Sequence, residues 1–198
     1  MEAYIRIIRW KNLIFILLIQ WLMQYAVVHP MLQTYGFEIY NRDIFNILLY
    51  AATILITAGG YVINDYFDVK IDRINRPDRV IVSEKITSKA AMILYQILTG
   101  SGVISGLALA ILSHSFTLGF IFLLTPGLLW FYSASYKRQF ITGNLIVSFS
   151  ASLVALVVGV LEVSLLKIQF GNLLSQTPIP AQVYGWTGGF AGFAFFCT

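Results

Sequence analysis

The chain has 198 residues, of which 58% are hydrophobic and only 11% are charged. A soluble domain carries about 25% charged residues, so this chain cannot cover itself with a polar surface and lipid is its expected solvent. The net charge of +4 does not indicate nucleic-acid binding, because the basic residues lie between apolar stretches rather than in one patch. A single cysteine, Cys197, excludes an intrachain disulfide.

Apolar runs long enough to cross a bilayer recur along the whole chain, since a membrane helix needs about 20 such residues. The sequence therefore predicts an all-α fold, a polytopic transmembrane helix bundle that forms one membrane domain over residues 1–198. The six expected spans are about 12–28, 44–63, 90–112, 116–135, 143–166, and 181 to the end. The first run begins like a signal peptide but has no small-x-small cleavage site, so we expect it to be retained. Pro126 would lie inside the fourth span, where neighbouring helices can satisfy the freed carbonyl.

Successive spans cross the membrane in opposite directions, and most basic residues fall in the segments on one side of it. The N-terminus, the polar segment 64–89 and the loop near 137 fall on the same side, and together they hold 11 of the 13 Lys and Arg residues. The other side keeps Arg42 and Lys167. The positive-inside rule then places the N-terminus and segment 64–89 in the cytoplasm, with the protein in the cytoplasmic (inner) membrane.

The most informative polar residues follow the second span. Asn64, Asp68 and Asp72 are spaced i, i+4 and i+8, so they share one face if the helix continues through them, with Asp65 one step round. Carboxylate and amide oxygens are ligands that suit Mg2+, and substrate phosphates usually complete its shell. The alternative is a solvated loop of alternating charges, but three oxygen donors on one face at the mouth of a bundle favour a metal site.

The run Asn64-Asp-x-x-Asp68-x-x-x-Asp72, followed by Arg76-Pro77, resembles the first Asp-rich motif of the UbiA superfamily of intramembrane prenyltransferases. The wider run Ile63-Asn-Asp-Tyr-Phe-Asp through Ile74-Asn-Arg-Pro-Asp-Arg79 is similar to the branch that includes digeranylgeranylglyceryl phosphate synthases. That branch usually continues with Pro-Ile-Pro-Ser-Gly, where this chain has Val80-Ile-Val-Ser-Glu84.

Two further segments resemble the same family. The stretch Phe131-Tyr-Ser-Ala-Ser-Tyr-Lys-Arg ends the fourth span on the expected cytoplasmic side, and Arg9-Trp-Lys-Asn12 opens the first. By resemblance, Tyr132 and Ser133 would line the cavity near a prenyl diphosphate, Lys137 or Arg138 would lie near its phosphates, and Asn12 would face the site. Read without the family, the same residues are an interfacial aromatic belt, positive-inside charges and an ordinary helix start.

The resemblance implies a Mg2+-dependent enzyme of isoprenoid lipid or quinone biosynthesis. It would transfer a polyprenyl group from a prenyl diphosphate to a lipid or aromatic acceptor, geranylgeranylglyceryl phosphate-like or hydroxybenzoate-like, within the membrane. The implied metal ligands are Asn64, Asp68 and Asp72. The implied catalytic residues are Asp68, Asp72, Tyr132 and Lys137, and the implied substrate-binding residues are Asn12, Asp65, Arg76, Ser133 and Arg138. Acceptor identity, prenyl chain length and oligomeric state stay open.

The family's second Asp-rich motif has no counterpart here, because no Asp follows Asp78 and the only later acid is Glu162. The resemblance implies a fold of about nine helices, so the chain is expected to be the N-terminal two thirds of it, with the C-terminal part missing. A chain that ends at Thr198 would be an inactive fragment, a non-catalytic membrane protein or a transporter subunit. A CDP-alcohol phosphotransferase is a weaker alternative, because its Asp-Gly-x-x-Ala-Arg sequence is not found at 43–67. We expect Glu162 to make an interhelical hydrogen bond or to snorkel.

Overall fold

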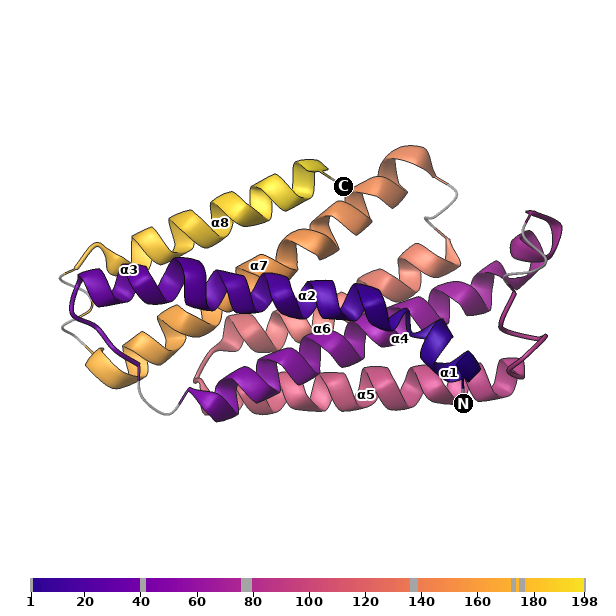
Figure 1. The fold of residues 1–198 in the computed structure, drawn as a ribbon, viewed down its shortest axis with the longest axis horizontal. Coiled ribbons are helices and arrows are strands. Elements are labelled where there is room, and N and C mark those ends of the chain that lie inside the picture. Colours follow the sequence, from indigo (N-terminus) through magenta and orange to yellow (C-terminus); the bar gives the residue numbers. More distant parts are fainter. Residues whose placement is uncertain are drawn as a thin grey trace.

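A computed structural model describes residues 2–39, 42–75, 80–135, 139–171, 174 and 177–197, and nearly all of these residues are helical. The elements in chain order are α1 (Glu2–Ile7), α2 (Trp10–Leu22), the π-helical η1 (Met23–Val28), α3 (His29–Thr34), α4 (Asp43–Asn75), α5 (Ser88–Leu112), α6 (Phe116–Ala134), α7 (Phe140–Phe170) and α8 (Ile179–Cys197). Within the described part of the chain, β structure is limited to an isolated bridge between Val82 and Ile86. The elongated bundle is shown in Figure 1.

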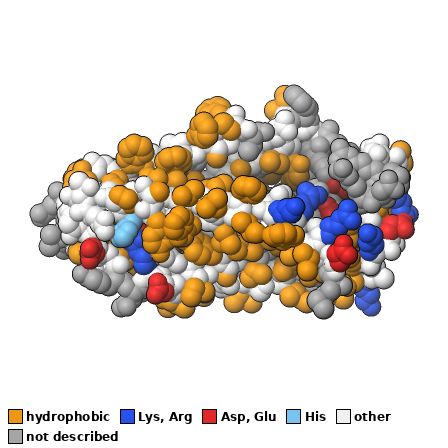
Figure 2. All heavy atoms as spheres, viewed as in Figure 1, with side chains coloured by type: hydrophobic (Ala, Val, Ile, Leu, Met, Phe, Trp, Pro, Cys, Tyr) orange, Lys and Arg blue, Asp and Glu red, His pale blue; other side chains and the backbone are white. Residues whose placement is uncertain are grey.

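Five helical segments are long and apolar enough to cross a membrane: Trp10–Thr34, Asp43–Asn75, Ser88–Leu112, Phe116–Ala134 and Ile141–Phe170. They correspond to the first five expected spans and confirm the helical bundle. The sixth expected span forms helix α8, which is not among these five. Hydrophobic side chains cover most of the middle of the visible face, whereas charged side chains gather toward its ends, most densely at the N-terminal end (Figure 2).

The helices extend further than the apolar runs indicated. The first span continues through Pro30 to Thr34, and Pro30 lies at the start of α3 directly after the π-helical η1. The second continues 12 residues beyond the expected end at 63, as far as Asn75. The expected spans end at the first polar side chains. The helices are longer because an α-helix can continue beyond the apolar layer.

The ends of the helices follow the expected alternation. Helix α1, the end of α4, the end of α6 and the start of α7 lie at one end of the bundle (Figure 1). The ends of α3, α5 and α7 and the starts of α4, α6 and α8 lie at the other end. The segments expected on a single side of the membrane are therefore together.

Close helix packing fixes α4 in the centre of the bundle. Gly102 of α5 faces Ile56 of α4 so closely that a Cβ on the glycine would lie 2.9 Å from the Ile56 backbone nitrogen. Gly59 of α4 meets the Thr99 side chain in the same way. Small residues let membrane helices approach this closely and gain van der Waals contact, since lipid supplies no hydrophobic drive between them.

Polar contacts link Arg9, α2 and η1 to α4 along the length of the first span. Because the helices run antiparallel, residue numbers rise on one as they fall on the other. The pairs are Arg9 with Asp65, Asn12 with Tyr61, Gln20 with Thr53, and Gln24 with Asn46. This ladder holds the first span against α4 in one register.

The polar segment 64–89 is divided between helix and loop. Its first part belongs to α4, and the loop that follows packs Ile81, Val82 and Ile86 into a buried cluster with Ile7. Arg73 and Glu84 form an ion pair of 3.3 Å across this turn, although both side chains are 54% exposed and the pair adds little stability. Thr87 caps α5, accepting a hydrogen bond of 3.2 Å from the Ala90 N–H.

Candidate active site

The metal-type oxygen donors lie on α4, which is continuous through all of them because Pro77 is the first proline after Pro30. Asn64, Asp68 and Asp72 line one cavity, as their spacing predicts, and Asp65 lines it too. Asn64 Nδ2 donates to Asp68 Oδ2 over 3.0 Å, which fixes the orientation of that carboxylate. Asp68 is only 7% exposed. A carboxylate so withdrawn from solvent at a membrane helix end marks a candidate site.

Asp65 points toward the first span. It forms an ion pair of 2.7 Å with Arg9, and its side chain is 17% exposed. The Arg9 guanidinium also lies 5.0 Å from the Tyr61 ring centroid, a cation–π distance. Arg9 occupies the junction between α1 and α2 with a left-handed backbone (φ 52, ψ 50). The corner of the chain at Arg9 is therefore held against α4 beside the acidic face.

The cavity has a volume of about 1260 Å³ and is lined by residues of α1, α2, η1, α4, α6, α7 and α8 and by Ile81 of the loop before α5. Its polar end carries the α4 acids together with Arg6 and Arg9. Most of its other walls are apolar; they include Met23, Ile56, Phe122, Leu129, Val157 and Phe190. Cavities of 300–1,000 Å³ with mostly apolar walls and a few convergent polar groups are typical of ligand sites. This cavity suits an anionic group attached to a long apolar chain.

Two further residues expected in the site line the cavity, and a third lies beside it. Tyr132 and Ser133 of α6 line the cavity, and Ser133 Oγ donates to the Leu129 carbonyl over 2.8 Å. Asn12 is exposed; its Nδ2 contacts the Tyr61 hydroxyl at 3.4 Å, and Tyr61 itself lines the cavity. Arg76, Lys137 and Arg138 lie outside the described residues.

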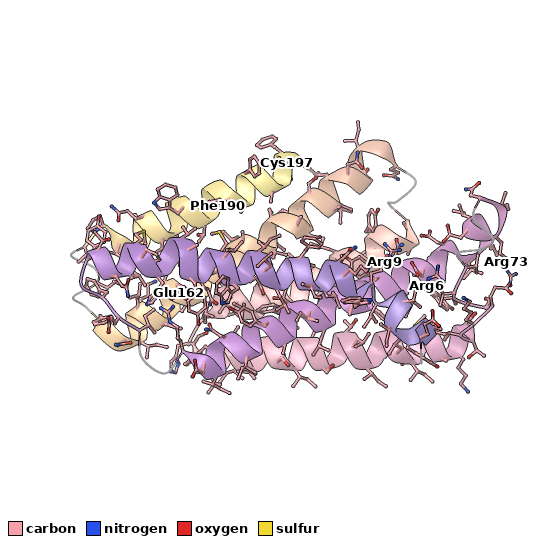
Figure 3. All side chains as sticks on the ribbon, viewed as in Figure 1. Arg6, Arg9, Arg73, Glu162, Phe190 and Cys197 are labelled. Carbon is pink, nitrogen blue, oxygen red and sulfur yellow. The ribbon has the colours of Figure 1, made fainter. Side chains whose placement is uncertain are left out.

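Sequence reasoning did not identify Arg6, Arg9 and Tyr61 as site residues. By sequence alone, Arg6 is a topology signal and Arg9 is a topology signal and part of a family-like segment, yet both line the polar end of the cavity (Figure 3). Tyr61 is one turn before Asp65 on α4. The helical period from the acidic residues back to Tyr61 was the signal that would have found it.

The donor set fits a divalent cation that a substrate helps to bind. In the described part of the chain, no group of three or more His, Cys, Asp or Glu residues is close enough to hold a metal ion unaided. Asn64, Asp68 and Asp72 offer hard oxygen donors in a row at the cavity. Mg2+ is usually bound by one or two carboxylates with waters and substrate phosphates, so this set suits Mg2+ in the presence of a phosphate ligand.

A second polar cluster, the Glu162 cluster, lies toward the opposite end of α4. It comprises Gln24, Arg42, Asn46, Tyr50 and Glu162, from η1, α4, α7 and the residue before α4. Arg42 Nη2 pairs with Glu162 Oε2 at 3.1 Å, Gln24 Nε2 donates to Asn46 Oδ1 at 2.8 Å and to Glu162 Oε1 at 3.4 Å, and the Tyr50 hydroxyl donates to Gln24 Oε1. Glu162 is fully buried, which confirms its expected interhelical bond, and it does not snorkel. Figure 3 shows Glu162 and Arg9 far apart along the bundle.

Comparison with known proteins agrees with this arrangement. Residues 13–198 match the model of the UbiA prenyltransferase family. A protein of Ignicoccus hospitalis named digeranylgeranylglyceryl phosphate synthase is 39% identical over 102 residues, 52% of this chain and 32% of its own length. The proteins of that name from Sulfolobus acidocaldarius and Saccharolobus solfataricus are 36% and 42% identical, over 62% and 54% of this chain and 42% and 36% of theirs.

A solved structure described as "Structural and mechanistic insights into the biosynthesis of Digeranylgeranylglyceryl phosphate synthase in membranes" superposes with a TM-score of 0.63 at 27% identity. The match covers 84% of this chain and 59% of the solved one. The chain thus spans less than half the length of the curated relatives it matches. The match to the family model nevertheless includes nearly all of its residues, so the chain belongs to the UbiA prenyltransferase family.

Proposed function

We propose that this chain binds a prenyl diphosphate with Mg2+ and takes part in transferring the prenyl group to a glycerol phosphate lipid inside the membrane. The observation that carries the proposal is the row Asn64, Asp68 and Asp72 at the polar end of a large, mostly apolar cavity. The names of the curated relatives favour the lipid acceptor over an aromatic one. Asp65, Arg76, Lys137 and Arg138 complete the proposed phosphate environment.

The protein's part in binding follows from charge and polarity. Asn64 holds Asp68 in position, so the α4 face presents oriented oxygen donors without a further change of rotamer. Arg6 and Arg9 line the same polar end of the cavity, where their positive charges attract the diphosphate. The hydrocarbon tail would follow the apolar walls, where its burial contributes roughly 0.8 kcal/mol per CH2 group.

In the proposed reaction, the allylic C–O bond breaks and its electron pair leaves with the diphosphate. When bound, Mg2+ would neutralise the charge that develops on this leaving group. The acceptor hydroxyl oxygen then forms the new C–O bond, and its proton passes to the released diphosphate. The apolar walls exclude water from the allylic cation, and the face of the Tyr132 ring stabilises it.

The proposed membrane side also follows from charge. The α4 face and the N-terminus lie at one end of the bundle, and this end carries most of the basic residues. The positive-inside rule places this end in the cytoplasm. A water-soluble diphosphate head group would then enter the site from the cytoplasmic side, while its tail enters from lipid.

The test is binding of a non-hydrolysable prenyl thiolodiphosphate to the detergent-solubilised chain, with Mg2+ and with excess EDTA. We expect binding that requires Mg2+ and that falls at least tenfold in Asp68→Asn. Asp43→Asn is the matched control, because Asp43 is an exposed acid at the other end of the same helix and does not line the cavity. A binding affinity that is unchanged both by EDTA and by Asp68→Asn would contradict the proposal and favour a non-catalytic membrane protein.

A further inference from the structure

The deep end of the cavity is lined by residues of five helices. On the first span and on α4, the lining residues furthest from the acids are Met23 and Thr53. Phe122 of α6, Val157 of α7 and Phe190 of α8 line the cavity from the other three helices. Fifteen residues separate Asp68 from Thr53 on α4, which is about 22 Å at the helical rise of 1.5 Å per residue. The cavity therefore has a finite depth.

The Glu162 cluster lies directly beyond this end. Gln24 follows Met23 in the chain, and Asn46 and Tyr50 precede Thr53 on α4 by one to two turns. Leu49 and Leu161 are packed beside the cluster and are fully buried. An apolar chain cannot displace this layer without separating a buried ion pair and its hydrogen bonds, which is strongly unfavourable. The Glu162 cluster therefore limits the cavity behind Met23 on the side of η1 and α4.

The backbone around Met23 is unusual and is fixed by the same cluster. Met23 opens the π-helical segment η1, in which the His29 N–H donates to the Gln24 carbonyl five residues earlier. π-Helical turns are rare and occur frequently at functional sites. Gln24 is fully buried and hydrogen-bonded through both polar atoms of its amide, so it cannot rotate freely. Its neighbour Met23 is thereby directed at the cavity, where the side chain is 4% exposed.

We infer that Met23 is the residue that sets the longest prenyl chain the cavity accepts, with Gln24 acting as its positioning residue. The inference rests on the proposed function, since it concerns the tail of the same donor. Methionine is unbranched and fills irregular space, so its end group forms the floor on which the tail would end. Replacing it changes the depth of the cavity, while the acids at the other end are untouched.

The size of the change is bounded by the Glu162 cluster. Met23→Ala vacates only the volume of the methionine side chain, because the Glu162 cluster stands behind it. The variant should therefore accept about one more isoprene unit rather than tails of any length. Met23→Trp places a larger side chain at the same position and so shortens the cavity. This variant should exclude the last isoprene unit of the donor that the unmodified chain prefers. A hydrophobic pocket discriminates a single methylene by roughly tenfold or more, so either shift is measurable.

The experiment measures binding of prenyl thiolodiphosphates of fifteen, twenty and twenty-five carbons to the chain in detergent with Mg2+. We expect Met23→Ala to raise the affinity for the twenty-five-carbon compound relative to the twenty-carbon one by on the order of tenfold. Met23→Trp should lower twenty relative to fifteen by a similar factor, and Met23→Phe provides the same test should the tryptophan variant not fold. Met92→Ala is the control, because Met92 is on α5 and does not line the cavity.

The outcomes separate the two proposals. Length ratios that shift in opposite directions in the alanine and tryptophan variants support the inference. If the unmodified chain binds prenyl diphosphates but the variants keep its ratios, or lose all lengths equally, Met23 is only a packing residue and the inference is wrong. If the unmodified chain binds no prenyl diphosphate of any length, the proposed function itself fails, and the inference fails with it.

Discussion

Arg42 and Glu162 form an ion pair of 3.1 Å although 120 residues separate them in the chain. The Arg42 side chain is 10% exposed and that of Glu162 is fully buried. A charge pair inside the apolar layer is costly to separate, because either partner alone would be an uncompensated charge in a medium of low dielectric constant. The pair therefore connects the start of α4 to α7, with η1 bound to both through Gln24.

Removing one partner of this pair should destabilise the bundle far more than removing both. We expect Glu162→Leu to cost about 3–5 kcal/mol, because Arg42 is left buried without its anion. The double variant Arg42→Met, Glu162→Leu should recover most of that loss. Thermal unfolding in detergent, followed by circular dichroism, measures both. Additive losses, in which the double variant costs as much as Glu162→Leu and Arg42→Met together, would show that the pair is not coupled.

The backbone at Arg9 gives a second prediction, which separates charge from conformation. Its left-handed φ of 52 favours glycine, whereas other L-residues are strained there by about 1–2 kcal/mol. Arg9→Gly and Arg9→Ala both lose the ion pair with Asp65, so their difference isolates the backbone. We expect the glycine variant to be more stable than the alanine variant by about 1 kcal/mol. Identical unfolding midpoints would contradict the left-handed turn.

Two glycines on α5 make a matched pair for the packing of α4 against α5. Gly102→Ala should be destabilising by on the order of 1–3 kcal/mol, because the new Cβ would lie 2.9 Å from a backbone nitrogen that cannot move aside. Gly100→Ala should be neutral or stabilising, because nothing lies within 4 Å of its Cβ position and alanine is the better helix former. Unfolding midpoints of the two variants, measured in one detergent, test this contrast.

The proposed orientation predicts which end of the bundle faces the cytoplasm. In a Cys197→Ser background, Lys85→Cys lies in the exposed loop after α4 and His114→Cys in the exposed turn between α5 and α6. A membrane-impermeant maleimide should label His114→Cys in intact cells, and Lys85→Cys only after permeabilisation. The reverse pattern would show that the N-terminus is outside and would remove the argument for a cytoplasmic diphosphate.

How much of this could be predicted from sequence depends on the range of the interactions. The shared face of Asn64, Asp68 and Asp72 is a local property of helical period, and it was predicted correctly once α4 continued through it. The helix boundaries were less accurate because polarity ends an apolar run without ending a helix. The ion pair between Arg73 and Glu84 depends on how the chain turns after α4, and the sequence did not predict it.

Long-range pairs were beyond the sequence. Nothing near Glu162 identifies Arg42 as its partner, because their contact depends on how α7 packs against α2 and η1. The same holds for the site role of Arg9, whose i, i+3 relation to Arg6 fits a topology signal equally well. The π-helical turn at Met23–Val28 is also not encoded by a recognisable pattern, apart from Pro30 just beyond it.

The polar ladder between the first span and α4 has a consequence for biosynthesis. Its four pairs join residues that are separated by only 22 to 56 positions, and all of them precede Asn75. All four pairs need only the first 75 residues, and chains emerge from the ribosome N-terminus first. The first two spans can therefore associate as a helical hairpin while the remainder is still being translated. The acidic face would then be in place before α6, α7 and α8 enclose it.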